Sequence, residues 1–297
     1  MIKIFEDAFT VAVAKKEGFD IRKAKETVFH VIKNGWTYWI ADPFPIEVDG
    51  ELYIFAEMWR YRYLKGCIAY TKLTPEGFKK WKPVIEEKFH LSYPNIFRQG
   101  GKIYICPEAN ESGEIFLYEC INFPEKWKKT KILYQGGRYC DTTFYRSPNG
   151  IFGFTYQLHQ ENSDELKLMK IENGKMEISE GKIENLGEDM IRPGGNILKV
   201  GEKEFRVVQI GVPTYGSGLL FSEFWIDWPN FKEKKVLSLY PKDLCWDKKK
   251  NYSGIHTLNE TEHYVVIDLK WNRVNVIELF WKSIRKIKKI LKKIISR

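Results

Sequence analysis

Hydrophobic and polar residues alternate in short runs along most of the chain, and Gly, Asn, Asp or Pro interrupt them about every ten residues. Alternation with a period of two is typical of strands that bury one face. Three segments join two such runs through a tight-turn pair, namely Asp49-Gly50, Gly100-Gly101 and Asn149-Gly150. Pairs of this kind between alternating runs indicate β-hairpins. We therefore predict an all-β body.

The hairpins resemble one another, which indicates an internal repeat. Residues 43–50 match residues 94–101, and each match is followed by an aromatic-aliphatic run that ends in Glu57 or Glu108. The shared residues at shared places favour a repeated blade over two packed sandwiches, which would show similar alternation without the repeat.

Three further units begin at Asp141, at Arg192 and around His256. Their spacing of roughly 50 to 60 residues suits the four-stranded blade of a β-propeller. The last unit has no outer strands of its own, and the N-terminal runs 9–16 and 27–35 supply them. The sequence therefore predicts a five-bladed β-propeller, closed by its N-terminal strands.

The C-terminal segment follows another period. Apolar residues at 280, 284, 287, 291 and 294 recur at steps of four and three, as on one face of a helix. Residues 281–297 hold eight Lys and Arg and no acid, so of the net charge of +9 only about +1 belongs to the rest of the chain. We predict the propeller over 1–275 and a basic amphipathic α-helix over 276–297.

A basic amphipathic helix is typical of contact with an anionic membrane surface, which we expect for residues 280–297. The alternatives are a helix docked on the propeller with its basic face in water, or a nucleic-acid contact. We expect no nucleic-acid partner, because the nearly neutral body offers no basic groove.

Targeting signals and cysteines bear on the compartment. The N-terminus lacks a charged start followed by an apolar run and a cleavage site, and no apolar run reaches the ~18 residues of a membrane span. The five cysteines form an odd set without CxxC spacing. We expect a cytoplasmic protein, peripheral on the inner face of the cell membrane.

Polar residues mark the starts of the predicted inner strands. Because these strands line the central channel of a propeller, we expect their first residues to converge in a polar ligand site. The residues are Asp42, His90 with Tyr93, Asp141, Arg192 and His256. Each also has a structural interpretation: Asp42 and Asp141 as turn residues, Arg192 as an ion-pair partner of Asp141 or Glu188, and His256 as a buried core histidine.

Several motifs resemble known families. The segment ADPF around Asp42 and the segment YCDTTFY around Asp141 resemble motifs of glycoside hydrolase family 43 and its furanosidase relatives. The resemblance implies that Asp42 is a general base and that Asp141 tunes the catalytic acid. An ordered set over residues 36–268, which includes HLSYPNIF, IRPGG, VPTYGSG with Tyr215, and GIHTLN, more closely resembles a propeller family found beside glycosyltransferase or formyltransferase domains. That family is named after the N-terminal domain of glucosamine inositolphosphorylceramide transferases.

One position departs from the hydrolase pattern. Arg192 in MIRPGG stands roughly where family 43 carries its acid Glu. Hydrolysis needs a carboxylic acid there, and a guanidinium does not release its proton. Glu108 or Glu188 would have to replace that acid. Arg192 instead suits a phosphate group, which it can bind through two hydrogen bonds.

We therefore expect an enzyme, a glycosyltransferase that uses a phosphate-activated sugar donor in surface polysaccharide or glycolipid biosynthesis, acting alone or with other polysaccharide-assembly enzymes. In this interpretation Asp42, Asp141 and Glu108 are catalytic. The expected substrate-binding residues are His90, Tyr93, Arg192, His256 and Tyr215. A family 43-like glycosidase acting on furanosides and a glycan-binding module without catalysis remain as alternatives. No cofactor or metal is required by the sequence, although a cation bound in the channel is compatible with it.

Overall fold

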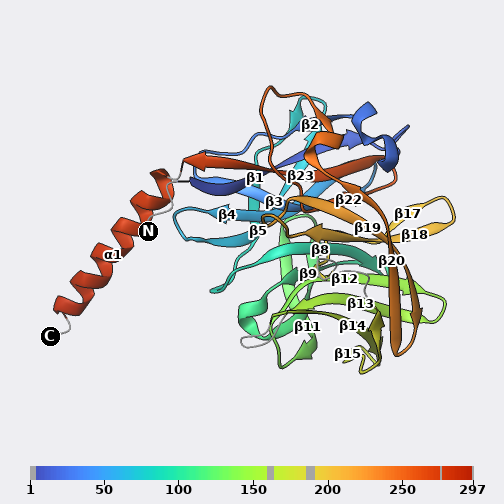
Figure 1. Cartoon of the computed structure of the whole chain (residues 1–297). Coiled ribbons are helices and arrows are strands. Elements are labelled where there is room, and N and C mark those ends of the chain that lie inside the picture. The colour runs from blue at the N-terminus through green and yellow to red at the C-terminus, as the bar shows by residue number, and fades with distance from the viewer. Residues whose placement is uncertain (1–4, 159–163, 185–190, 275, 296–297) are drawn as a thin grey trace.

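The computed structural model describes residues 5–158, 164–184, 191–274 and 276–295. Within these ranges five sheets stand around a common axis, and one α-helix follows them (Figure 1). The sheets are antiparallel except for two short parallel pairings at outer edges. The predicted five-bladed propeller and its C-terminal helix are therefore confirmed.

Blades 1 to 3 follow one another along the chain, and each runs from the channel outwards. Blade 1 consists of β3 (Tyr38–Val48), β4 (Glu51–Arg60), β5 (Lys65–Thr74) and β6 (Gly77–Phe78), and β7 (Lys82–Ile85) also pairs with β5. Blade 2 consists of β8 (Ser92–Gln99), β9 (Lys102–Glu108), β10 (Glu114–Asn122) and β11 (Lys126–Gln135). Blade 3 consists of β12 (Tyr139–Ser147), β13 (Gly150–Gln157), β14 (Glu165–Glu172) and β15 (Lys175–Ile178).

Blade 4 and the closing blade are more composite. Blade 4 consists of β17 (Leu198–Val200), β18 (Lys203–Ile210), β19 (Gly218–Asp227), β20 (Asn230–Leu239) and β16 (Ile183–Glu184). The closing blade consists of β22 (Leu258–Glu260), β23 (Tyr264–Val274), β1 (Phe5–Lys15), β2 (Val28–Val31) and β21 (Cys245–Trp246). Three short 3₁₀ helices, η1 (Ile21–Glu26), η2 (Asn110–Ser112) and η3 (Pro241–Asp243), lie in the connections.

The ring closes through one long pairing. All eleven residues of β1 pair antiparallel with β23, from Phe5 opposite Val274 to Lys15 opposite Tyr264. The N-terminal runs assigned to the last blade are thus strands β1 and β2 of that blade. β1 thereby covers the outer edge of β23, and N-terminal and C-terminal strands share one sheet.

Local chemistry explains the hairpins. Asp49 and Gly50, between β3 and β4, have φ of 53° and 76°, as a two-residue turn with left-handed backbone requires.

The blades then pack face to face through apolar clusters. Phe44 and Tyr93, from blades 1 and 2, meet edge to face with ring centroids 4.7 Å apart. Complete burial of such a ring contributes about 1.5–3 kcal/mol.

The helix α1 (Val276–Ile295) follows β23 and projects from the propeller (Figure 1), and Arg285 donates to the Arg62 carbonyl, between β4 and β5, at 2.9 Å. Because β22 and β23 are antiparallel, the end of β23 lies where the inner strands begin. The helix therefore leaves the propeller at the end that carries the predicted site. Among the described residues, no helix has the length and apolar character needed to cross a membrane.

Candidate functional site

The inner strands of blades 1 to 3 carry the same backbone irregularity. The pairing register shifts between Ala41 and Phe44, between Ser92 and Asn95, and between Cys140 and Thr143. One residue inside each bulge has a left-handed backbone: φ is 49° at Asp42, 43° at Tyr93 and 54° at Asp141. Non-glycine residues rarely adopt this conformation, and a bulge redirects its side chain. The repeat thus places three predicted site residues at equivalent points of the channel.

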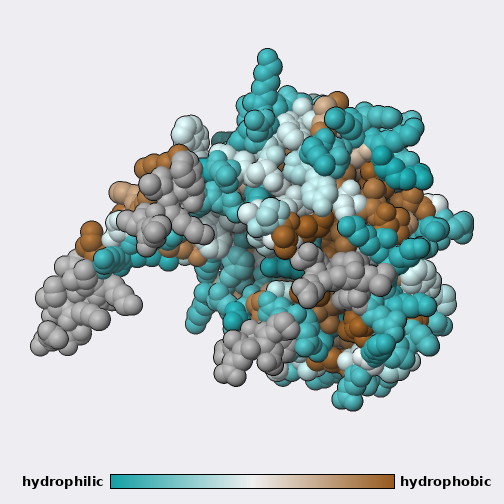
Figure 2. Space-filling view, in the orientation of Figure 1, coloured by the Kyte–Doolittle hydropathy of each residue, from teal (hydrophilic) through white to brown (hydrophobic). Residues whose placement is uncertain are grey.

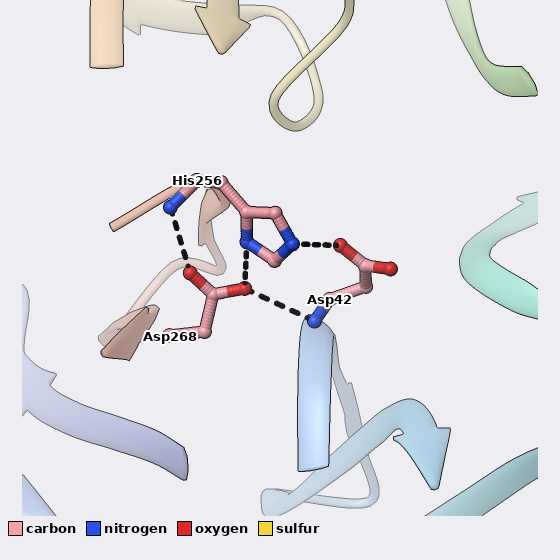
Figure 3. Close-up of side chains that lie close together, drawn as sticks. All are labelled: Asp42, His256 and Asp268. Atoms are coloured by element: carbon pink, nitrogen blue, oxygen red, sulfur yellow. Dashed lines mark hydrogen bonds and ion pairs between the residues drawn. The ribbon is translucent and has the colours of Figure 1, made fainter. Parts of the chain in front are cut away.

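Asp42 belongs to a chain of three buried side chains (Figure 3). His256 Nδ1 lies 2.5 Å from Asp268 Oδ2, and its Nε2 lies 3.6 Å from Asp42 Oδ1. The backbone N–H of Asp42 donates to Asp268 Oδ2 at 3.1 Å. His256 is therefore oriented by Asp268 and directed at Asp42, the arrangement that fixes an imidazole for proton chemistry.

Asp42 and Asp268, the two aspartates of this hydrogen-bonded trio, accept different numbers of hydrogen bonds from the protein. Asp268 accepts the backbone N–H groups of His256 and Thr257 on Oδ1, at 2.9 and 3.1 Å. Asp42 accepts the Thr257 hydroxyl at 2.9 Å and the Tyr93 N–H at 3.2 Å. Each oxygen of Asp268 thus has two donors, while each oxygen of Asp42 has one conventional hydrogen bond and room for another.

Burial and neighbouring charges shift the pKa values of His256 and Asp42. Burial alone would lower the pKa of His256, but Asp268 and Asp42 outweigh it, and the pKa is raised. Burial raises the pKa of Asp42, and the nearby His256 opposes that rise. His256 is consequently a buried imidazolium, and Asp42 is a carboxylate more basic than an ordinary one, as a general base requires.

Asp141 forms the opposite part of the site, with Arg192. Arg192 Nε donates to Asp141 Oδ2 at 2.5 Å, and Gln209 Nε2 donates to the same oxygen at 3.1 Å. Burial raises the pKa of Asp141 to about 6, while Arg192 opposes the rise. The Arg192 side chain is 28% exposed, and within the described part of the chain it donates a hydrogen bond through Nε alone. Its remaining donors are available to a ligand.

Two glutamates flank His90 between blades 1 and 2. His90 Nδ1 accepts the Gly66 N–H at 2.9 Å, so Nε2 carries a proton and lies 3.5 Å from Glu57 and 4.0 Å from Glu108. Glu108 also accepts from Ser92 and from the Asn110 backbone at 3.0 Å. These contacts favour a loop-holding role for Glu108, whose catalytic role stays a prediction.

Glu57 differs from Glu108 in its electrostatics. It is 6% exposed. Burial, followed by the charges of Asp42, Glu108 and Asp141, raises its pKa well above the usual value. Burial and the neighbouring carboxylates therefore favour the protonated form of Glu57, which can act as a hydrogen-bond donor in the site.

Aromatic rings surround these polar groups. Phe9 stacks on His256 at 4.4 Å, and Tyr215, which is 42% exposed, meets the same imidazole edge to face at 5.2 Å. Arg192 lies 5.2 Å from the Tyr215 ring centroid. Tyr93, in contrast, is fully buried and its hydroxyl bonds Thr143 at 2.7 Å. Tyr215 is thus placed to contact a ligand, whereas Tyr93 supports the site through its backbone.

Three buried side chains of the site carry atoms that metal ions bind in other proteins. Asp42, His256 and Asp268 each offer one ligand atom within 4.8 Å of the others. However, His256 Nδ1 is hydrogen-bonded to Asp268, and both Asp268 oxygens are taken by N–H donors. A bound cation needs free ligand atoms, and most of these atoms already take part in hydrogen bonds. The three residues therefore form a hydrogen-bonded network and do not fit a metal site.

The sequence did not identify Asp268 or Gln209 as site residues, and it did not predict the raised pKa of Glu57. All three lie on second strands, opposite the start of an inner strand: Glu57 opposite Ala41, Gln209 opposite Arg192 and Asp268 opposite Thr257. Glu57 and Glu108 already matched by repeat, and extending that match to each blade would have found the others. The alternative acid Glu188 lies outside the described residues.

The fold defines a protein of the five-bladed β-propeller class, with two Asp residues, an Arg and aromatic rings at the channel. The chain matches the family described as "Glucosamine inositolphosphorylceramide transferase 1, N-terminal" over residues 27–239. It belongs to that family, as its motifs predict.

Relatives in plants share part of the chain. The glucosamine inositolphosphorylceramide transferase 1 of Arabidopsis thaliana is 37% identical over 97 residues, which cover 32% of this chain and 12% of the relative. The protein of the same name from Oryza sativa subsp. indica is 32% identical over 97 residues, covering 32% of this chain and 13% of the relative. The matches thus span about an eighth of the length of these relatives.

Solved structures share the fold. The catalytic domain of a Coprinopsis cinerea GH62 α-L-arabinofuranosidase superposes with a TM-score of 0.55 at 10% identity, covering 77% of this chain and 90% of that one. The GH43_1 enzyme from Xanthomonas citri gives a TM-score of 0.54 at 10% identity, covering 79% and 87%. At this identity the likeness establishes the propeller architecture alone.

Proposed function

We propose that this propeller transfers a sugar from a phosphate-activated donor to an acceptor at a membrane surface, in the biosynthesis of a surface polysaccharide or glycolipid. The observation that carries the proposal is the pairing of Arg192 with Asp141, which leaves donors of the Arg192 guanidinium free for a ligand. Arg192 is partly exposed, aromatic rings flank it, and Asp42 lies in the same channel.

The chemistry follows from the charges. A guanidinium with free donors binds the phosphate of a sugar nucleotide or a sugar phosphate. The phosphate leaves without needing a proton, so transfer does not require a carboxylic acid in the place of Arg192. Asp42, a buried carboxylate with spare acceptor capacity, takes the proton of the acceptor hydroxyl, and the imidazolium of His256 stabilises Asp42 in its charged form.

The position of α1 supports the membrane part of the proposal. The helix leaves from the site end of the propeller, and Phe280 and Ile287 are 59% and 56% exposed. Figure 2 shows hydrophobic surface along the described part of the helix, away from the propeller. Lying at the inner face of the cell membrane, such a helix would hold the channel near a lipid-linked acceptor.

A ligand screen tests the sugar chemistry. Saturation-transfer NMR of the whole chain against sugar nucleotides and simple furanosides is compared among the native protein, Arg192→Ala and Arg146→Ala. Arg146 is an exposed arginine at the far end of the inner strand β12 and serves as the control. We expect a sugar nucleotide to bind the native and Arg146→Ala proteins and not Arg192→Ala. Equal binding by all three would contradict the proposal.

Removal of residues 280–297 tests the membrane contact. The shortened and complete chains are sedimented with vesicles that contain anionic lipid. We expect the complete chain to bind and the shortened chain to stay in the supernatant, while both bind the same sugar nucleotide. Equal sedimentation of the two chains rules out the membrane contact.

Glu57 favours a second candidate function, hydrolysis of a furanoside. Burial, followed by the charges of Asp42, Glu108 and Asp141, raises its pKa, so that it would supply the proton that Arg192 cannot. Release of sugar from aryl furanosides that is lost in Glu57→Gln would favour this function over transfer. A propeller that binds glycans without turnover, and tolerates Asp42→Asn, would be a binding module.

A further inference from the structure

A second pocket lies beside the root of α1, at the same end of the propeller as the channel site. Its volume is about 530 Å³. It is lined by the segment 31–36 after β2, by Lys248, Lys250 and Tyr252, and by Trp271 and Arg273 near the end of β23. It does not share a lining residue with the Asp42 and Arg192 site.

The lining is charged with one sign. It includes Lys33, Lys248, Lys250 and Arg273, and the described lining residues include no carboxylate. Lys248 lies 3.6 Å from Asp247, outside the lining. Arg273 donates to the Tyr61 hydroxyl at 2.9 Å and to the Trp36 carbonyl at 3.1 Å, and its charge also acts on Glu6, which lies outside the lining. The pocket thus concentrates positive charge that its own walls do not neutralise.

The positive charge of the pocket affects the pKa of Lys250. Its Nζ lies 2.8 Å from the centroid of the Trp271 ring, and burial followed by the charge of Arg273 lowers its pKa to about 8. A cation held beside another cation is stabilised by an anion with several acceptor oxygens.

Trp36 completes the rim of the pocket. Its side chain is 85% exposed, although its backbone carbonyl is held by Arg273. An exposed Trp next to lysines is typical of surfaces that contact the interfacial layer of a membrane. The short distance along the chain from Arg273 to α1 places this rim beside the helix.

We propose that this pocket binds a phosphoryl group, presented by a lipid headgroup or by a soluble phosphate ester. Its Lys and Arg donors match the oxygens of that group. The proposal uses the position of α1 but not the chemistry at Arg192, so either can fail without the other.

The test compares two triple variants that remove the same charge. Lys33→Gln, Lys248→Gln and Lys250→Gln are combined in the pocket variant. Lys175→Gln, Lys234→Gln and Lys235→Gln, exposed residues on the outer strands of blades 3 and 4, form the control. Both carry Arg192→Ala, so that the channel site cannot bind the probe. Each is titrated calorimetrically with inorganic phosphate at constant ionic strength, and with phosphatidylcholine vesicles that contain phosphatidylglycerol.

We expect affinity for phosphate, for the vesicles or for both to fall roughly tenfold or more in the pocket variant and to stay unchanged in the control. A loss with inorganic phosphate identifies a site for any phosphoryl group. A loss with vesicles alone identifies the lipid headgroup as the source. Equal affinities for the two variants in both arms, at unchanged thermal stability, would overturn the proposal.

Discussion

His256 and Arg192 are both cations that face an aspartate in the channel, but the protein holds them differently. His256 is 2% exposed and lies between two aspartates, one of which is bound by three backbone N–H groups. Arg192 is 28% exposed and shares one oxygen of Asp141 with Gln209. His256 thus belongs to a network whose hydrogen bonds are all formed within the protein, whereas Arg192 has donors that are free to bind a ligand.

This difference separates rigidity from recognition within one site. A network whose donors and acceptors are all paired cannot accept a ligand without losing a bond, so it maintains the geometry of Asp42. A cation with unused donors can bind a ligand at little cost. We therefore expect the closing blade to position the base proposed at Asp42, and blades 3 and 4 to contact the proposed ligand.

The largest expected effect is on turnover. Asp42→Asn removes the base and keeps the shape, so the transfer rate should fall about 10²- to 10⁴-fold while donor binding changes less than about threefold. Rates of donor consumption with vesicles as acceptor, together with NMR titrations of the donor, check this. A variant that keeps its rate would show that Asp42 is not the base.

The next effect is on stability. Asp268→Ala leaves the buried His256 cation and three backbone N–H groups without their partner, and the free energy of unfolding should fall by about 3–5 kcal/mol. Urea unfolding followed by fluorescence measures the loss, with the exposed Asp227→Ala as control. A loss as small as that of the control would mean that the network does not hold the channel together.

Arg192→Lys sharpens the contrast from the recognition side. A lysine keeps the charge but not the planar donor pair, so donor affinity should fall roughly tenfold, and the free energy of unfolding should change by less than about 1 kcal/mol. The same titration and unfolding curves report both quantities. A stability loss as large as that of Asp268→Ala would make Arg192 a structural residue after all.

The smallest expected effect depends on pH. Asp141 has a pKa of about 6, raised by burial, so it gains a proton as the pH falls through that value and releases its hold on Arg192. Affinity for a diphosphate donor should therefore increase a few-fold from about pH 8 to about pH 5. Asp141→Asn should flatten the profile, and a decrease in affinity at low pH would contradict the assignment.

The hairpins and the repeat were predictable because they depend on local rules. Turn pairs such as Asp49-Gly50 and period-two alternation leave a direct trace in the sequence, and the repeat then placed Asp42, Asp141 and His256 near one channel. Asp268 and Gln209 were missed because a single polar residue inside an apolar strand resembles an ordinary solvent-facing one. Only the ring brings these side chains to the inner strand of a neighbouring blade.

The pairing of β1 with β23 has a consequence for the order of events during synthesis. The hydrogen bond between Asp42 and Asp268 joins positions 226 residues apart, and the strand that carries Asp268 is also the partner of β1. While a chain emerges from the ribosome, blades 1 to 3 can form, yet Asp42 has no histidine to face. The network around Asp42 therefore forms in a single late step, when β23 meets β1. If Asp42 is the base proposed above, a chain that lacks β23 is expected to have no transfer activity.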